Sequence, residues 1–359
     1  MIVEGAIVDS GGPRTGYLRI REGRVEEVGL LGTDSTHGKE RRVRGIVVPA
    51  PVNAHTHLGD SGYGRRPPST SLAEVVGAPG GEKFRFLAEA GRRRKRSGIT
   101  EALRRMSREG VAGVIDFREE GLPGVRLLRA AARSSGLPVT ILGRPLRRPV
   151  DPAEVEALLA ESEGVGLSSA REEPAEVRRP IAEACRARGK LYALHASEEN
   201  RELPESFLDP LPDLLVHLLS ATEEDLARVA VAKVPVAVCP RSNALFGRTP
   251  DLSAFERQHV RMLLGTDNGM LNAPSLLREL EFAYVSQRLL KHPVTPDYLV
   301  RAAFVEPWSL LGHPERAQIT AGSTGPLLVL RLPTDDPEYA LVARSTEAVI
   351  VRPEGAPPP

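Results

Sequence analysis

Short apolar runs alternate with helical patterns through the middle of the chain, and this alternation limits the possible folds more than any other feature. The first run is at residues 45–53, and the others follow at 111–117, 137–143, 164–169, 190–196, 213–219, 234–240 and 260–267. Eight strands in a βα repeat predict an α/β protein built as a (β/α)8 TIM barrel. A doubly wound sheet is the alternative, but the G-x-G-x-x-G turn that it often carries is absent after the first strand.

Short alternating segments at the two ends of the chain predict a second, smaller unit. Small antiparallel strands with glycine-based turns are expected before residue 48, and similar strands return at 325–332 and 347–353. We expect both ends to pair in one β-sandwich-like domain beside the barrel. The predicted division is 1–48 and 319–359 for this domain, including a disordered tail, GAPPP, and 49–318 for the barrel.

The composition narrows the class of protein. A net charge of +1 over 359 residues argues against a nucleic-acid or membrane-surface partner. No apolar run approaches the roughly 18 residues that span a bilayer, and the N-terminus reads as a strand and not as a signal peptide. Only Cys185 and Cys239 are present, without a C-x-x-C pair, so a disulfide framework is not expected. A cytoplasmic protein fits these observations; a homo-oligomer is compatible with them.

Two histidines stand one residue apart directly after the first apolar run. Residues i and i+2 of a strand face the same side, so His55 and His57 can point at one ion. In a barrel, functional groups gather at the carboxyl ends of the strands. His195, His217 and Asp267 all fall at the ends of later runs. The sequence therefore predicts a metal centre at this rim.

The residue types at this rim indicate hydrolytic chemistry. Imidazole and carboxylate groups suit one borderline divalent ion, such as Zn²⁺, with Fe²⁺ or Mn²⁺ as alternatives. Such an ion lowers the pKa of a bound water, which then attacks as metal-bound hydroxide. Asp267 can bind the metal or accept the proton of the water, and His217 can orient the nucleophile. Glu198, three residues after His195, is placed to shuttle a proton to the substrate.

The motifs NAHTHLGD, HASE, VHLLSA, CPRSN and GTDN resemble the amidohydrolase superfamily in its mononuclear, deaminase-like branch. That branch includes cytosine, guanine and S-adenosylhomocysteine deaminases and s-triazine hydrolases. The resemblance implies that four residues bind the metal: His55, His57, His195 and Asp267. It also implies that Glu198 is the proton shuttle and His217 the polarising base.

Other members of the superfamily bind two metals, bridged by a carboxylated lysine after the fourth strand. The segment 164–173 contains no lysine, and Lys190 is predicted at the opposite end of the barrel. A single metal is therefore favoured, with a second metal bridged by Glu172 or Glu173 left open.

Further residues are predicted at the same rim, where a substrate would bind. These candidate substrate-binding residues are Arg118, Glu119, Arg144, Ser168 and Asn268. The segment 59–83 is long for a connection, as lids and substrate walls often are, and a plain surface excursion is an equal alternative. The basic run Arg92–Arg96 lies in a helical stretch and is interpreted as a solvated face.

The sequence thus predicts a metal-dependent aminohydrolase. Its substrate would be a small-molecule heterocycle bearing an amino group, such as a purine, pyrimidine, pterin or nucleoside, and the products would include ammonia. The alternative is a hydrolase that uses the same centre on an amide, a cyclic urea or a halogenated ring. The residues alone do not identify the substrate.

Overall fold

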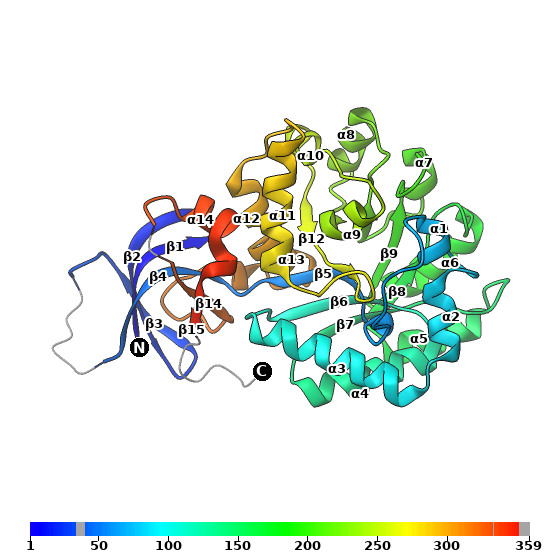
Figure 1. Cartoon of the computed structure of the whole chain (residues 1–359), viewed down its shortest axis with the longest axis horizontal. Coiled ribbons are helices and arrows are strands. Elements are labelled where there is room, and N and C mark those ends of the chain that lie inside the picture. Colours follow the sequence, from blue (N-terminus) through cyan, green and yellow to red (C-terminus); the bar gives the residue numbers. More distant parts are fainter. Residues whose placement is uncertain (34–39, 333, 352–359) are drawn as a thin grey trace.

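The computed structural model describes residues 1–33, 40–332 and 334–351. The GAPPP tail that was predicted to be disordered lies outside these residues. Two sheets are formed, a mixed sheet built from both ends of the chain and a curled parallel sheet surrounded by helices (Figure 1). Within the described residues, no helix is long and apolar enough to cross a membrane.

The curled sheet confirms the predicted α/β class and is consistent with a TIM-like barrel. Its strands, in sheet order, are β12 (Met262–Leu264), β11 (Val236–Val238), β10 (Leu214–His217), β9 (Leu191–Ala196), β8 (Gly164–Leu167), β7 (Val139–Gly143), β6 (Gly113–Arg118), β5 (Val52–His57) and β13 (Asp267–Asn268). All pairings are parallel. Because β12 and β13 are consecutive in the chain but stand at opposite ends of this order, the sheet curls back to its first strand.

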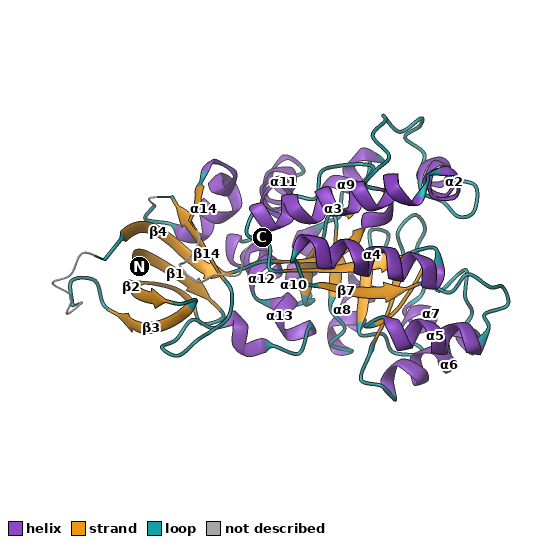
Figure 2. Ribbon diagram, turned by 90° about the horizontal axis from the view of Figure 1, so that it is seen from below, coloured by secondary structure: helices purple, strands orange, loops and turns teal. Residues whose placement is uncertain are grey.

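Helices cover the outside of this sheet (Figure 2). In the described residues they are α1 (Leu72–Val75), α2 (Glu82–Glu89), α3 (Arg92–Arg108), α4 (Gly121–Ser135), α5 (Pro152–Glu161), α6 (Ala175–Arg186), α7 (Pro204–Phe207), α8 (Glu223–Val231), α9 (Pro240–Leu245), α10 (Leu252–Arg257), α11 (Leu276–Leu289), α12 (Pro296–Phe304), α13 (Glu306–Leu310) and α14 (Pro337–Arg344). Side-chain caps fix where several of these helices begin. The side chain of Asp151 accepts from the Ala153 backbone ahead of α5, and Thr222 and Asp225 form a capping box at α8.

Strand alternation produces two apolar layers. Leu214 and Val216 on β10 belong to a cluster contributed mainly by the strands, whereas Leu215 between them joins the larger core that includes the helices. Because successive strand residues face opposite sides, the first cluster fills the inside of the curled sheet. Phe117 from β6 belongs to this inner cluster and is fully buried.

The terminal unit is one six-stranded sheet. Its order is β15 (Val349–Val351), β14 (Leu327–Arg331), β4 (Arg42–Pro49), β1 (Ile2–Asp9), β2 (Gly12–Arg21) and β3 (Arg24–Gly29). The predicted pairing of the two chain ends is confirmed by the antiparallel β14–β4 ladder. The prediction of antiparallel strands was wrong for β1 and β4, which pair in parallel. Alternating polarity indicates which face of a strand is buried but not which way the strand runs.

The apolar run at 45–53 was interpreted as a single barrel strand, and this was wrong. Its first part lies in β4 of the terminal sheet, and its last part begins β5 of the curled sheet. Pro49 and Pro51 interrupt the run, since proline has no amide hydrogen to donate to a ladder. Between them, Ala50 donates its backbone N–H to the Pro326 carbonyl at 2.8 Å. His55 and His57 consequently lie within β5 and not after it.

Candidate metal centre

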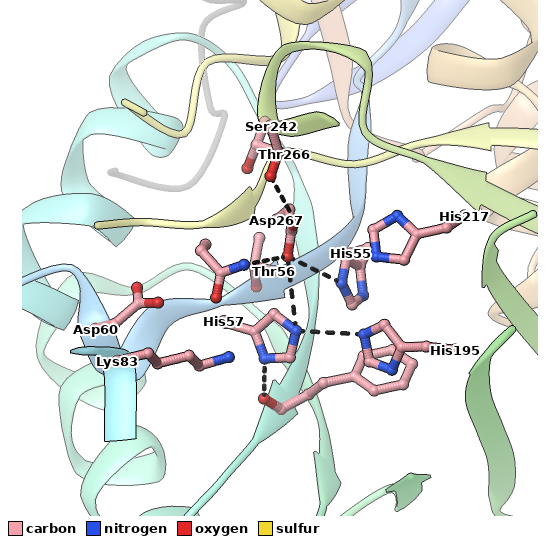
Figure 3. A network of polar contacts seen from close by, with 12 residues as sticks. His55, Thr56, His57, Asp60, Lys83, His195, His217, Ser242, Thr266 and Asp267 are labelled. Atoms are coloured by element: carbon pink, nitrogen blue, oxygen red, sulfur yellow. Dashed lines mark hydrogen bonds and ion pairs between the residues drawn. The ribbon is translucent and has the colours of Figure 1, made fainter. Parts of the chain in front are cut away.

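Five side chains from four strands converge at the carboxyl ends of the curled sheet (Figure 3). They come from β5, β9, β10 and β13, and they are His55, His57, His195, His217 and Asp267. Three sets of three residues, drawn from these five and Glu198, each offer ligand atoms within 4.8 Å of one another. The parallel sheet brings the set together because the ends of all its strands lie on one rim.

His57 and His195 present ring nitrogens to each other. The Nδ1 of His57 lies 3.0 Å from the Phe117 carbonyl and that of His195 lies 2.9 Å from the Leu167 carbonyl, so each Nδ1 carries the hydrogen. Burial lowers the pKa of both rings, which keeps them neutral. Their Nε2 atoms, 3.3 Å apart, therefore face each other with lone pairs. A cation bound by both nitrogens would relieve this repulsion.

His55 has no hydrogen-bond partner on either ring nitrogen although it is fully buried. Burial lowers its pKa to about 3, so the ring is neutral at physiological pH. Its ring packs edge-on against Phe117, with centroids 4.6 Å apart. A buried polar atom without a partner is rare in native proteins and requires a specific explanation. Coordination of a metal ion supplies one.

Asp267 contributes the carboxylate of the set. Its Oδ1 lies 3.4 Å from His55 Nε2 and 3.6 Å from His57 Nε2. Ser242 Oγ donates to Oδ2 at 2.6 Å, and Asn268 Nδ2 donates to Oδ1 at 2.8 Å. Burial acts to raise the pKa of Asp267, but the neighbouring rings of His55, His217 and His57 together hold the pKa well below the ordinary value. Neutral imidazoles and an ionised carboxylate form a donor set that suits a divalent ion such as zinc.

Glu198 and His217 form the outer part of the set. His217 Nε2 lies 3.3 Å from Glu198 Oε1, and its Nδ1 lies 3.4 Å from the Asn243 side-chain amide. Burial raises the pKa of the Glu198 carboxyl, a direction that suits proton transfer near neutral pH. The backbone of His217 has a φ of 76° and that of Asp267 a φ of 58°. Left-handed backbone at non-glycine residues is costly and concentrates at functional sites.

A cavity opens over this centre. It is lined by His57, His195, Glu198, His217 and Asp267, and also by Arg144, Ser168 and Asn268 from the predicted substrate-binding group. Arg118 and Glu119 do not line it and are buried nearby. Of the five predicted substrate-binding residues, three therefore line the cavity and two are buried away from it.

Glu119 is the centre of a buried charged group that sequence reasoning missed in part. Its Oε1 lies 2.5 Å from Lys83 Nζ and 2.6 Å from His57 Nδ1, and its Oε2 accepts from Arg118 at 2.8 Å. Burial acts to raise the pKa of Glu119, but Lys83, then His57 and Arg118, hold it well below its ordinary value. Lys83 lies on α2, at the end of the long segment whose role the sequence left open.

The structure bears on the predictions made for Lys190 and for a second metal bridged by Glu172 or Glu173. Lys190 donates to the Ser162 carbonyl at 2.6 Å and stays away from the centre, as predicted. Among the described residues, no candidate metal-binding group includes Glu172 or Glu173, and Glu173 is paired with Arg148 at 2.6 Å. Ser242, which no sequence argument selected, sits next to Asn243 in the CPRSN motif, and that motif was the available signal.

A sequence model described as the amidohydrolase family matches residues 46–351. The chain belongs to this family, as the fold and the convergent histidines already indicate. It is 29% identical to a putative aminohydrolase of Methanothermobacter thermautotrophicus over 367 residues, covering 94% of this chain and 92% of that one. It is 31% identical to the aminodeoxyfutalosine deaminase of Deinococcus radiodurans over 323 residues, covering 74% and 73%.

Solved structures share the fold at lower identity. An adenosine deaminase from Xanthomonas campestris with bound zinc has a TM-score of 0.73 at 17% identity, covering 98% of this chain and 91% of that one. A mutant atrazine chlorohydrolase from Arthrobacter aurescens, complexed with zinc and atraton, also has a TM-score of 0.73, at 15% identity, covering 95% and 90%. The chain is thus a hydrolase of the amidohydrolase family, related to deaminases and similar in fold to a chlorohydrolase.

Proposed function

We propose that the protein is a metal-dependent aminohydrolase that deaminates an amino-substituted nitrogen heterocycle and releases ammonia. The observation that carries the proposal is the pair of neutral imidazoles of His57 and His195, whose Nε2 lone pairs face each other 3.3 Å apart. This arrangement suits a cation and is unfavourable without one. Asp267 and His55, which form a candidate metal-binding group with His57, would join these residues in holding one divalent ion, for which zinc is our first candidate.

The chain's own residues supply the remaining chemistry. A bound divalent ion would contribute Lewis acidity that brings the pKa of water towards neutrality. Glu198, with its raised pKa, accepts a proton and delivers it to the ring nitrogen next to the amino-bearing carbon. His217, 3.3 Å from Glu198 and supported by Asn243, hydrogen-bonds to the oxygen that is added. Ser242 keeps Asp267 oriented through its 2.6 Å hydrogen bond.

The relatives support deamination and also an alternative. The deaminase names among them favour loss of an amino group, from a purine-like, pyrimidine-like, pterin-like or nucleoside substrate, with aminodeoxyfutalosine among the candidates. The likeness to a chlorohydrolase favours the second candidate, hydrolysis of a halogenated ring by the same centre. A cytoplasmic location is part of the proposal.

A panel of aminated heterocycles, scored for ammonia release, tests the reaction. Glu198→Gln is expected to reduce turnover by about a thousandfold or more while the metal content stays unchanged, because the group that moves the proton is lost. Glu205→Gln, an exposed glutamate paired with Arg228, is the control and should behave as wild type. Full ammonia release by the Glu198 variant would exclude the proposed proton transfer. Chloride release without ammonia would favour the alternative.

A further inference from the structure

Arg144 is a buried cation without a counter-ion. The residue follows β7, is 8% exposed and lines the cavity over the metal centre. Within the described residues its guanidinium makes no hydrogen bond or ion pair, and its Nε is buried without a partner. Burial lowers its pKa, the direction expected for a cation that lacks compensation. An unpaired buried charge is among the most destabilising features a fold can keep.

The acidic side chains closest to Arg144 are engaged elsewhere or reach solvent. Glu119 is held by Lys83, His57 and Arg118. Glu173 is paired with Arg148 at 2.6 Å, and Glu172 is exposed at the cavity edge, beyond ion-pair distance of Arg144. Among the described residues, none of these carboxylates forms an ion pair with Arg144.

The position of Arg144 suits recognition of a second group on the substrate. Its strand lies between β6 and β8, and the strands of His57 and His195 flank these three in the sheet. Arg144 and both histidines line one cavity. A ring placed at the histidines can therefore present a substituent to the guanidinium.

We propose that Arg144 binds a carboxylate or phosphate group of the substrate, so that the enzyme prefers anionic amino-heterocycles to neutral ones. A guanidinium matches these anions because its planar fork donates two parallel hydrogen bonds. The buried position strengthens these bonds and excludes competing water. This inference rests on the proposed function, since it describes the substrate of the same site.

Matched pairs of ligands test the proposal by calorimetry. The Glu198→Gln holoenzyme, in which turnover is expected to be too slow to consume the ligands during a titration, is titrated with adenosine and adenosine monophosphate, and with pterin and its carboxylic acid. The anionic member of at least one pair is expected to bind about tenfold to hundredfold more tightly, the range of a charge-assisted hydrogen bond. The two pairs separate phosphate recognition from carboxylate recognition.

Arg144→Gln in the same background should reduce this preference to near unity while the neutral members bind as before. Arg147→Gln is the matched control, since it removes an exposed arginine three positions away that is already paired with Asp151. The proposal would be overturned if the Arg144 variant still preferred the anionic ligands. It would also be overturned if the parent bound the anionic and neutral members of both pairs equally, or bound neither anionic member. Anion preference without ammonia release from any anionic substrate by the wild type would overturn the deaminase proposal instead.

Measurements of melting temperature distinguish a ligand-binding role of Arg144 from a structural role. If Arg144 is kept for its ligand, Arg144→Gln should melt at the same temperature as the parent or higher, because an unpaired buried charge has been removed. Adenosine monophosphate or pterin carboxylic acid should then no longer raise the melting temperature. A lower melting temperature with the anion response retained would show that Arg144 supports the fold and not the ligand. Arg144→Lys, which keeps the charge without the fork, should show an intermediate preference.

Discussion

Two stretches of the barrel rim differ in how their charges are satisfied. The histidine arc, formed by the ends of β5, β9, β10 and β13, carries neutral imidazoles and one carboxylate, with nitrogen lone pairs directed inward. The cationic arc, formed by the ends of β6, β7 and β8 together with α2, carries Lys83, Arg118 and Arg144. The first arc directs several lone pairs towards one point, and the second holds, among the described residues, one arginine whose side chain pairs with no carboxylate.

Under the two proposals, one rim would hold two kinds of ligand. The histidines are kept neutral by burial and by backbone carbonyls, so they are suited to a metal. In the cationic arc, Glu119 compensates Lys83 and Arg118 but leaves Arg144 uncompensated. Each arc therefore has its own unsatisfied group, and the same cavity joins them.

The largest effect is expected from removing a member of the histidine arc. His57→Ala should reduce the bound metal from about one ion per chain to almost none and reduce turnover by about a thousandfold or more, because a site of this kind needs all of its ligands. Elemental analysis and the ammonia assay measure both. His313→Ala, an exposed histidine 3.4 Å from Glu315, should keep metal and activity. Retained metal in the His57 variant would contradict the assignment.

A smaller effect is expected in the cationic arc. Lys83→Met removes the 2.5 Å partner of Glu119 and should lower the free energy of unfolding by about 3–5 kcal/mol, because breaking a buried pair leaves a charge uncompensated. Urea unfolding measures the change. Arg126→Met removes a surface pair with Glu161 and should leave the stability almost unchanged. Equal effects of the two substitutions would show that burial does not govern this arc.

A third effect, small within any one pH unit, concerns support of the histidine arc by Glu279. This carboxylate accepts from the Arg241 backbone at 2.6 Å, beside Ser242 and Asn243, and burial raises its pKa to about 8 from an ordinary 4.5. The folded protein binds this proton more tightly than the unfolded chain. Stability should therefore fall by about 1.4 kcal/mol per pH unit as pH rises from 4.5 towards 8, relative to Glu279→Gln. If the free energies of unfolding of the wild type and of Glu279→Gln changed with pH in the same way, this pKa would be contradicted.

Much of the histidine arc could be predicted from the sequence because the residues next to a strand end indicate where the strand stops. An apolar run followed by a polar residue fixes where a strand ends, and parallel strands bring those ends together. His195, His217 and Asp267 could be placed in this way. Their individual roles belong to the proposed function.

The cationic arc was harder to predict. Lys83 reaches Glu119 only because the segment after β5 folds into helices, and no periodic pattern gives that path. Ser242 donates from the first turn of α9, which begins directly after β11, and the direction of its side chain depends on where that helix begins. The run at 45–53 was interpreted as one strand because apolar residues continue on both sides of Pro49 and Pro51, which alone mark the change from β4 to β5.

The short connection between β4 and β5 has a consequence for folding during translation. β4 hydrogen-bonds on one side to β1 and on the other to β14, which is translated only after the whole curled sheet. While the chain is still on the ribosome, the strand that carries His55 and His57 is attached to a sheet with an open edge. β14, which is made later, covers that edge, so the support of the first two histidines depends on a strand that is synthesised after the curled sheet.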